Sequence, residues 1–511
     1  MDKSLILHVI IMWRSEIMNE TRIIGSFFKP RQKAIAKYAT QTEAIQDKVL
    51  RQLVTKAGKT EWGLSHDYQN IKRYQDFQQR VPVQTYEEIK EYVDRMRHGE
   101  KNILWPGEVV WYAKSSGTTN DKSKFIPVSK EGLQTVHYAG GRDAVALYLQ
   151  NNPDSRIFSG RTLILGGSHA PNYNLKNSLV GDLSAILLHE TARWGMSMRA
   201  PKIETALLSD FEQKIDRIAD ECASQRITAF AGVPSWTLEL MRRVLERTGK
   251  QNLLEVWPDM ELFLHGDVEF TPYRRAYREL IPSNGMHYMV TYNASEGFFA
   301  AADDPARDDM LLMLDYGTYF EFRDGEQIVP LEGVECGKTY AMLITSDNGL
   351  WRYEIGDTVT FTSTDPYRIR FAGRTRQYIN AFGEELIVEN ADRALVEACQ
   401  KTGAVVNEYT VAPCYMSIDR QGAHEWIVEF DVEPDSVEHF AEVLDEALRA
   451  ANSDYDAKRR STIERQHLTL VERGFFLDWL KSRRKNKVPR LVPDRRIADE
   501  LHERLNQAKK K

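Results

Sequence analysis

The stretch YAKSSGTTNDKSKFIP, residues 112–127, gathers small hydroxyl side chains around one glycine directly after a predicted strand. Backbone N–H groups and hydroxyls in such a loop can face phosphate oxygens, and a lysine at its end adds positive charge. The phosphate-binding candidates are Ser115, Ser116, Thr118, Thr119 and Lys124. A surface turn rich in Ser and Thr has the same composition, so the loop alone leaves both interpretations open.

The spacing within this loop argues against one common class of phosphate site. The GxxxxGK[ST] pattern of a P-loop is absent from it. A kinase or GTPase function therefore loses its main support.

The rest of the chain has the pattern of a layered α/β protein. In residues 31–97 apolar side chains recur at helical spacing, which predicts one or two amphipathic helices. Beyond Gly107, short apolar runs alternate with helix-like segments such as Phe211–Cys222 and Ser235–Leu245. From Met310 to Thr364 one strand-like segment follows another, which predicts an antiparallel β subdomain.

The chain after Gly373 has the pattern of a second, small α+β domain. Its predicted elements are a helix near Asn390–Cys399, strands at Glu408–Ala412 and Glu425–Phe430, and a helix at Val437–Ala451. We therefore expect an N-terminal domain over residues 1–373 and a C-terminal domain over residues 374–511.

Composition excludes several classes of protein. The net charge of −6 over 511 residues supplies no basic field for nucleic acid. Four cysteines without a CxxC pair argue against a zinc ribbon or a disulfide scaffold and fit a reducing cytosol. The apolar run Leu5–Met12 is too short to span a bilayer. We expect a cytoplasmic protein without a membrane partner, and take a monomer as the default.

A second motif is TYNASEG, residues 291–297, which follows an apolar run. An aromatic side chain such as Tyr292 at a strand end can cover a purine face. The carboxylate of Glu296, four residues later, can bind Mg²⁺ through its oxygens. Tyr and Glu also occur near strand ends as packing and surface residues, so this motif is weak by itself.

A third motif is WRYEIGD, residues 351–357, in which a glycine turn presents Asp357. A carboxylate beyond a strand can accept hydrogen bonds from both ribose hydroxyls. An aspartate in a β-turn that bonds to its own backbone is the alternative.

Order and spacing make the three motifs more specific together, and here the sequence resembles a known family. It is similar to the adenylate-forming acyl-acid amido synthetases of the auxin-responsive Gretchen Hagen group, in their bacterial form. That group belongs with the acyl-CoA synthetases, adenylation domains and firefly luciferase. The resemblance runs from about residue 30 to residue 495. The matching segments are Ser115–Thr119 with Lys124, Tyr292–Glu296, Tyr353–Asp357, Phe371–Arg374 and Lys487–Arg490.

The resemblance implies a fold and an activity. The fold is α/β, with a large adenylate-forming N-terminal domain of mixed sheets plus a β subdomain, and a small mobile α+β C-terminal domain. The activity is the ATP-dependent conversion of a carboxylic acid to acyl-AMP, with release of pyrophosphate and transfer of the acyl group to an amine or amino acid. An acyl-CoA or acyl-carrier ligase would share the adenylate. A non-catalytic nucleotide-binding regulatory protein is an alternative of another class.

The resemblance also implies roles for single residues. Ser116, Thr118 and Thr119 contact phosphates, Tyr292 the adenine, Glu296 Mg²⁺, and Asp357 the ribose; Ser115, Lys124, Ser295 and Phe371 belong to the same ATP site, and Arg374, at the hinge, reaches the ribose. Lys487 bridges acyl and phosphate oxygens, with Lys485 as the alternative. His265 is the candidate contact to the acid, against the alternative of no direct role. In Gly383-Glu384-Glu385 a glutamate stands where plant members carry a lysine.

Overall fold

The computed structural model describes residues 20–115, 124–167, 172–175, 178–191, 197–266, 268, 270–375, 377–483 and 488–508. Several sequence predictions fall outside these residues: the run Leu5–Met12, the phosphate-loop residues Ser116, Thr118 and Thr119, and the lysines Lys485 and Lys487. Of Ser115, only the backbone is described.

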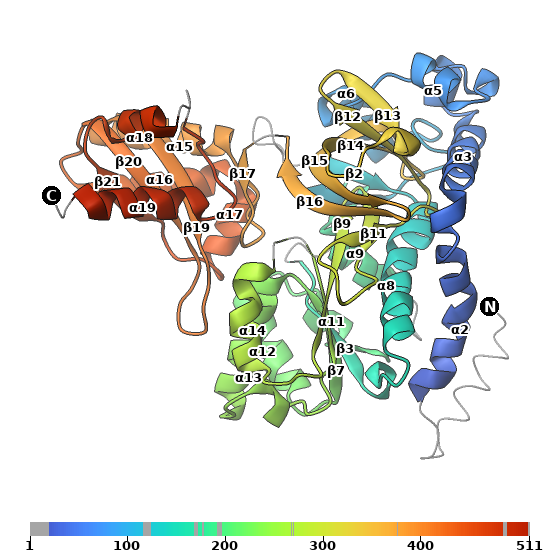
Figure 1. Ribbon diagram of the computed structural model, residues 1–511, viewed down its shortest axis with the longest axis horizontal. Helices are drawn as coiled ribbons and strands as arrows, with labels where there is room; N and C mark the ends of the chain where they lie inside the picture. The colour runs from blue at the N-terminus through green and yellow to red at the C-terminus, as the bar shows by residue number, and fades with distance from the viewer. Residues whose placement is uncertain are drawn as a thin grey trace.

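A long mixed sheet forms the centre of the molecule (Figure 1). In the described part of the chain its strand order is β13-β12-β14-β15-β16-β11-β10-β9-β8-β7-β3-β6. The strands are β3 (Arg161–Ile164), β6 (Arg199–Ala200), β7 (Ile227–Gly232), β8 (Leu262–His265), β9 (His287–Ala294), β10 (Gly297–Ala301), β11 (Met310–Leu312), β12 (Thr318–Asp324), β13 (Gln327–Pro330), β14 (Thr339–Ser346), β15 (Leu350–Thr364) and β16 (Tyr367–Arg374). Neighbours from β6 to β9 are parallel, whereas those from β9 to β13 are antiparallel.

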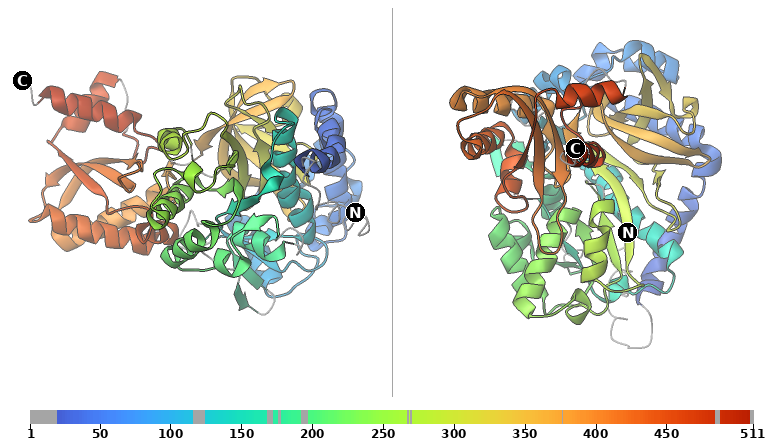
Figure 2. Two further views of the ribbon diagram at one scale, coloured as in Figure 1. Left: turned by 90° about the horizontal axis from the view of Figure 1, so that it is seen from below. Right: turned by 60° about the vertical axis from the view of Figure 1, so that its left-hand side comes forward.

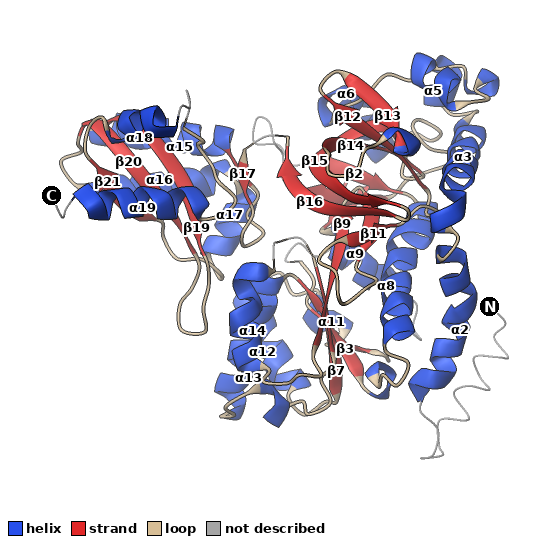
Figure 3. Cartoon of the chain, in the orientation of Figure 1, coloured by secondary structure: helices blue, strands red, loops and turns tan. Residues whose placement is uncertain are grey.

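Helices cover both faces of the parallel part of this sheet (Figure 3). Phe230 and Phe263 pack in one cluster with Leu238, while Ala229 packs in the other with Leu147. Strands buried on both faces read as nearly continuous apolar runs, which is why the sequence shows them clearly. The covering helices are α8 (Tyr138–Asn151) on one face and α12 (Phe211–Cys222), α13 (Pro234–Thr248) and α14 (Arg274–Leu280) on the other. The other short elements of this part of the chain are α7 (Lys130–Gly132), α9 (Leu183–Glu190), α11 (Ile203–Ala206), η3 (Leu133–His137), η4 (Ile157–Ser159), η5 (Leu253–Glu255), η6 (Thr271–Tyr273) and η7 (Leu331–Gly333).

A smaller sheet, in the order β2-β1-β5-β4, carries the phosphate-loop candidate. Its strands are β1 (Trp111–Ser115), β2 (Lys124–Val128), β4 (Asn172–Leu175) and β5 (Ser178–Gly181). β1 and β2 pair in antiparallel fashion, with Ser115 opposite Lys124. The two ends of the predicted loop are therefore fixed next to each other.

Helices near the N-terminus pack on the core along the right-hand side and the top of Figure 1. They are α2 (Glu20–Ile35), α3 (Tyr38–Ala57), α4 (Glu61–Ser65), η2 (Tyr68–Asn70), α5 (Tyr74–Arg80) and α6 (Tyr86–Arg97). The predicted amphipathic pattern corresponds to α2 and α3, whereas the sequence analysis did not predict α4, α5 and α6.

The residues from Tyr378 onward form a smaller α+β unit, at the left of Figure 1 and turned forward in the right-hand view of Figure 2. Its elements are β17 (Tyr378–Ile379), β18 (Leu386–Ile387), α15 (Val388–Thr402), β19 (Val405–Cys414), β20 (Ala423–Val432), α16 (Val437–Ala451), α17 (Ser453–Arg459), β21 (His467–Val471), α18 (Phe475–Arg483) and α19 (Arg496–Ala508). The sheet β19-β20-β21 has α15 and α16 on one face and α18 and α19 on the other. The predicted fold class, a large α/β part with a small α+β part after it, is confirmed.

A search of the described residues for a helix long and apolar enough to cross a membrane found none.

Candidate active site

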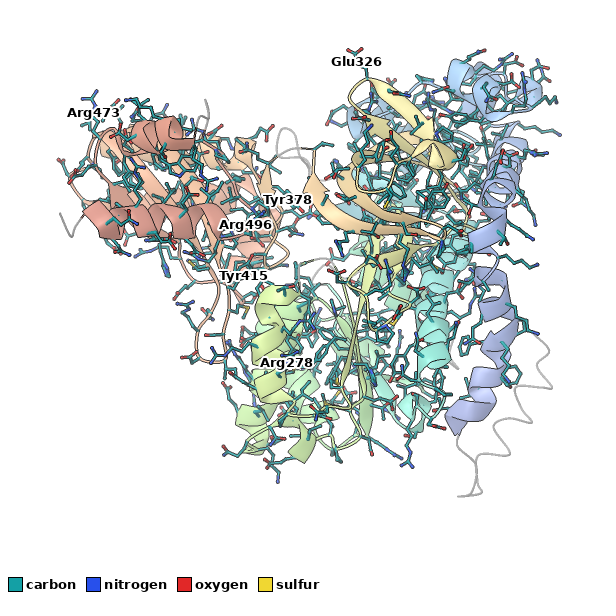
Figure 4. The ribbon with its side chains drawn as sticks, in the orientation of Figure 1. Arg278, Glu326, Tyr378, Tyr415, Arg473 and Arg496 are labelled. Carbon is teal, nitrogen blue, oxygen red and sulfur yellow. The ribbon has the colours of Figure 1, made fainter. Side chains whose placement is uncertain are left out.

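A cleft of about 1100 Å³ lies between the large sheet and the C-terminal unit. Figure 4 labels Tyr378 and Tyr415, which line the cleft from the C-terminal side; Arg473 and Glu326, in the same view, lie far from it. Eight residues predicted from the sequence line this one cleft: Lys124, His265, Tyr292, Ser295, Glu296, Asp357, Phe371 and Arg374. Motifs that are far apart in the chain are thus brought together.

The second and third motifs lie on one sheet, at the end of β9 and on β15, with β16, β11 and β10 between them in the strand order. Glu296 lies in the turn between β9 and β10. Asp357 on β15 lies directly opposite Arg374 on β16, so their side chains share one face of the sheet. Gly356, just before Asp357, has φ +88°, a conformation that glycine adopts without steric cost.

Asp357 accepts two hydrogen bonds at the edge of the cleft. The Tyr292 hydroxyl donates to Asp357 Oδ2 at 2.7 Å, and Arg374 Nε donates to Oδ1 at 3.1 Å. Burial raises the pKa of Asp357, and the positive charge of Arg374 opposes that shift. The ring of Tyr292 meets Phe371 edge to face, with centroids 5.7 Å apart. Both carboxylate oxygens are thus held in fixed directions beside an aromatic pair.

Glu296 is a buried carboxyl, 7% exposed, at the wall of the cleft. Burial raises its pKa to about 7, while the charge of Lys124 acts in the opposite direction. The described part of the chain holds no cluster of three or more His, Cys, Asp or Glu that could bind a metal. A single carboxylate is nevertheless compatible with Mg²⁺, which commonly combines one or two protein carboxylates with waters and substrate phosphates.

Lys124 enters the cleft from the smaller sheet. It is the first residue of β2, and its ammonium lies 6.0 Å from the centre of the Tyr86 ring. Ser115 is its partner across the β1–β2 pair. The structure therefore places the ends of the predicted phosphate loop next to the cleft.

His265 ends β8 and is 5% exposed. Its ring stacks on Phe270 with centroids 4.2 Å apart. Burial lowers the pKa of His265 to about 3, and Arg274 contributes to that shift. Its Nδ1 has no hydrogen-bond partner among the residues that the structure describes. The cleft therefore has a neutral imidazole set among aromatic and apolar side chains.

The loop between β17 and β18 also contributes to the cleft, and no motif in the sequence predicted this. Asn380, Ala381 and Glu385 line the cleft from this loop, and Glu385 Oε1 lies 3.1 Å from Arg374 Nη2. In the sequence, the segment Gly383-Glu384-Glu385 stood out only as a departure from a family pattern. Its contact depends on how the chain folds back, so no local pattern could have revealed it.

Comparison with known protein families gives three consecutive matches. The GH3 family N-terminal domain matches residues 31–286, the GH3 family central domain matches residues 311–374, and the GH3 family C-terminal domain matches residues 389–496. The matches cover most of the chain. They include five of the cleft residues predicted from the sequence, namely Lys124, His265, Asp357, Phe371 and Arg374. The other three lie between the first two matches: Tyr292, Ser295 and Glu296.

Curated relatives are similar along most of their length. Indole-3-acetic acid-amido synthetase GH3.2 of Arabidopsis thaliana is 24% identical over 469 residues, covering 74% of this chain and 83% of the relative. The 4-substituted benzoates-glutamate ligase GH3.12 of the same plant is 21% identical and covers 82% of this chain and 86% of the relative.

Solved structures share the fold. The AtGH3.15 acyl acid amido synthetase in complex with 2,4-DB has a TM-score of 0.58 at 18% identity, covering 92% of this chain and 95% of that chain. The 2-hydroxyisobutyryl-CoA ligase in complex with 2-HIB-AMP and CoA has a TM-score of 0.52 at 17% identity, covering 94% and 93%.

Proposed function

This chain belongs to the GH3 family, and we infer that it is an ATP-dependent acyl-acid amido synthetase. It activates a carboxylic acid as acyl-AMP, releases pyrophosphate, and transfers the acyl group to an amine or amino acid. Relatives in this family are named amido synthetases and glutamate ligases. The observation that carries the proposal is the convergence of separate motifs on one cleft.

The nucleotide is proposed to lie along the wall formed by β9, β15 and β16. Asp357 would accept hydrogen bonds from the ribose hydroxyls, with Arg374 beside it, and Tyr292 with Phe371 would cover the adenine. Ser115, Ser116, Thr118, Thr119, Ser295 and Lys124 are the proposed phosphate contacts. Fixed donors and cations stabilise charge that develops on phosphate oxygens during attack by the carboxylate.

Glu296 is the proposed protein ligand of Mg²⁺. When bound, the ion supplies positive charge to the phosphate oxygens. Glu296 is suited to this role because its carboxyl is buried and lines the cleft. A nearby cation on the nucleotide would favour the ionised form of the carboxyl.

The acid is proposed to lie beside His265. Val268, Phe270, Met286 and Tyr288 line the cleft there, and such a wall suits an acid with an apolar ring or chain. The neutral imidazole offers one hydrogen-bonding nitrogen without adding charge.

The remaining sequence predictions complete the proposal. The chain divides into domains at residues 1–373 and 374–511, and the second rotates between the two half-reactions to bring Lys487 to the acyl and phosphate oxygens. The protein acts as a cytoplasmic monomer on small molecules, without nucleic acid or membrane partners.

The test has two stages. Exchange of labelled pyrophosphate into ATP is measured with aryl, indolyl and fatty acids, and product masses are then recorded with the twenty amino acids and with coenzyme A. Acid-dependent exchange with an amide product supports the proposal. A thioester product would assign the acyl-CoA ligase alternative. ATP binding without exchange or product across the panel would assign the regulatory alternative.

A further inference from the structure

Glu385 has a backbone conformation that its residue type disfavours. Its φ is +40°, in the left-handed region where glycine is the favoured residue. Residues held in this way persist only where the surroundings enforce the conformation, and they gather at functional sites. The contacts of the Glu385 side chain must therefore explain why a glutamate stands at this position.

The surrounding loop, Asn380–Glu385, enforces that conformation. The buried carboxylate of Glu384 accepts hydrogen bonds from Phe382 N at 2.7 Å and Ala381 N at 3.2 Å, and it lies 2.7 Å from His424 Nε2. Asn380 Oδ1 accepts from Glu385 N at 3.1 Å. The loop is thus folded by its own side chains and by the C-terminal sheet.

The same loop is docked on the large part of the molecule. Ser235 Oγ and Trp236 Nε1 donate to the carbonyl of Phe382 at 3.3 and 3.2 Å, and the Tyr273 hydroxyl donates to the carbonyl of Ala381. These donors come from α13 and η6, and Thr271 of η6 lines the cleft. Contacts from both sides fix where the Glu385 side chain can reach.

The Glu385 side chain reaches Arg374. Its Oε1 lies 3.1 Å from Nη2 and its Oε2 lies 3.5 Å from Nη1, so both carboxylate oxygens face the guanidinium. Arg374 in turn donates from Nε to Asp357 and lies over the Tyr378 ring, 5.0 Å from its centre. Arg374 is therefore held on one edge by Glu385 and on another by Asp357.

We propose that Glu385 is a positioning residue for the nucleotide: it holds Arg374 against Asp357, so that the ribose-binding pair is complete only while the Asn380–Glu385 loop is docked. This inference rests on the proposed function in placing the ribose at Asp357. Without Glu385, the long Arg374 side chain regains rotamer freedom and loses a two-oxygen partner that fixes its plane. Affinity for ATP then falls, because the hydroxyls meet a less ordered site.

The experiment compares Glu385→Gln and Glu385→Gly with the wild type. Dissociation constants for ATP and for 2′,3′-dideoxy-ATP are measured by calorimetry, and Tm is measured for each variant. Both variants are expected to bind ATP roughly tenfold more weakly, whereas affinity for the dideoxy analogue is unchanged. Glu385→Gly is expected to keep or raise the Tm because it relieves the positive φ. Glu397→Gln is the control, since it removes an ion pair with Lys401 on the outer face of α15.

Three outcomes decide the matter. Unchanged ATP binding in Glu385→Gln would overturn the inference. Tighter binding would overturn it too, because Glu385 would then compete with the nucleotide for Arg374. An equal loss for ATP and the dideoxy analogue would also overturn it, since the effect would not act through the ribose. If the wild type binds ATP but Asp357→Asn binds it equally well, the proposed ribose site itself is wrong.

Discussion

Two arginines of the large sheet, Arg352 on β15 and Arg374 on β16, form clusters with carboxylates in opposite surroundings. In the first, Arg352 and Glu321 are 5% and 1% exposed, and Arg352 Nε lies 3.0 and 2.9 Å from the two Glu321 oxygens. In the second, Arg374 is shared by Asp357 and Glu385, is 22% exposed, and lines the cleft. We call the buried Arg352–Glu321 pair the closed cluster, and the cleft-lining group of Arg374, Asp357 and Glu385 the open cluster.

The two clusters share other features, so their difference is informative. Arg352 and Asp357 stand in one seven-residue motif, and both clusters contain a non-glycine residue of positive φ, Arg352 at +43° and Glu385 at +40°. Arg352 Nη1 also donates to the carbonyl of Val81 at 2.9 Å. In the open cluster two carboxylates face one guanidinium beside a cleft. A positive φ and a buried ion pair thus occur in both clusters and do not distinguish the binding site. The second cluster differs in that it lines a cleft and has two carboxylates for one guanidinium.

The largest effect is expected at the closed cluster. Arg352→Met leaves Glu321 buried without its ion-pair partner, which typically costs about 3–5 kcal/mol. Arg374→Met is expected to lower the free energy of unfolding much less, because its cluster is partly exposed, while weakening ATP binding. Denaturant unfolding and calorimetry of both variants test the difference. The double variant Arg352→Met/Glu321→Leu should recover most of the lost stability, since it leaves no uncompensated charge.

The comparison would be broken if Arg352→Met and Arg374→Met destabilised the protein equally while both left ATP affinity unchanged. Both clusters would then serve only to stabilise the fold.

The contrast also shows what the sequence could predict. Periodicity predicted α12 and α16 with the bounds that the structure has, Phe211–Cys222 and Val437–Ala451. It did not predict α19, although Ile497, Leu501 and Leu505 recur at helical spacing and pack on the C-terminal sheet. The segment before it, residues 481–496, is rich in Lys and Arg, a composition that is typical of a solvated face.

For the site, the sequence was informative where a side chain sits next to a strand end. Tyr292, Glu296 and Asp357 follow or end apolar runs, so local patterns located them, and the structure places all three on the cleft. Arg352 stands in the same motif as Asp357, and only the tertiary structure shows that it turns to Glu321 instead. Glu385 depends on a φ angle and on a fold-back contact, neither of which leaves a sequence pattern.

A second prediction sharpens the comparison at Glu296. Its pKa is raised from 4.5 to about 7 by burial, so the stability associated with its protonated form is present below about pH 4.5 and is lost as pH rises through 7. Glu296→Gln removes that loss and should be more stable than the wild type at pH 8, by at most about 3 kcal/mol. Activity should fall by roughly a hundredfold or more, because a charge that acts on the phosphates is gone.

Asp347→Asn is the matched control for Glu296→Gln. Burial also raises the pKa of Asp347 to about 7, and Asp347 is absent from the walls of the cleft. Unfolding at pH 5 and pH 8, with pyrophosphate exchange at each, should show a similar stability gain and unchanged activity. If both variants lost activity equally, the effect of Glu296→Gln would come from the change at a buried carboxyl and not from its position in the cleft.

The third prediction concerns Asp357. Asp357→Asn keeps the shape but removes the charge that faces Arg374, and it should weaken ATP binding by about 1–3 kcal/mol. Calorimetric titration with ATP measures this. Asp309→Asn is the control: Asp309 is also held by arginines, Arg307 and Arg368, and lies outside the cleft walls, so ATP affinity should be unchanged. Equal ATP affinity for Asp357→Asn and the wild type would remove Asp357 from the ribose.

The smallest effect is expected at His265, and a second histidine provides the comparison. Burial lowers the pKa of His265 to about 3 and that of His137 to about 4, and each has a ring nitrogen without a partner among the described residues. Because both pKa values are lowered, each neutral histidine contributes to the free energy of unfolding above about pH 6.5, and this contribution is lost as the pH falls toward the lowered pKa. A leucine at either position should therefore reduce the loss of stability at low pH. Of the two, only His265 lines the cleft. His265→Leu should therefore change the KM for the acid by a factor of roughly five, equivalent to about 1 kcal/mol, whereas His137→Leu should not. Equal KM values for the two variants, measured in the pyrophosphate exchange assay, would place His265 with the closed cluster, as a buried polar group that serves packing alone.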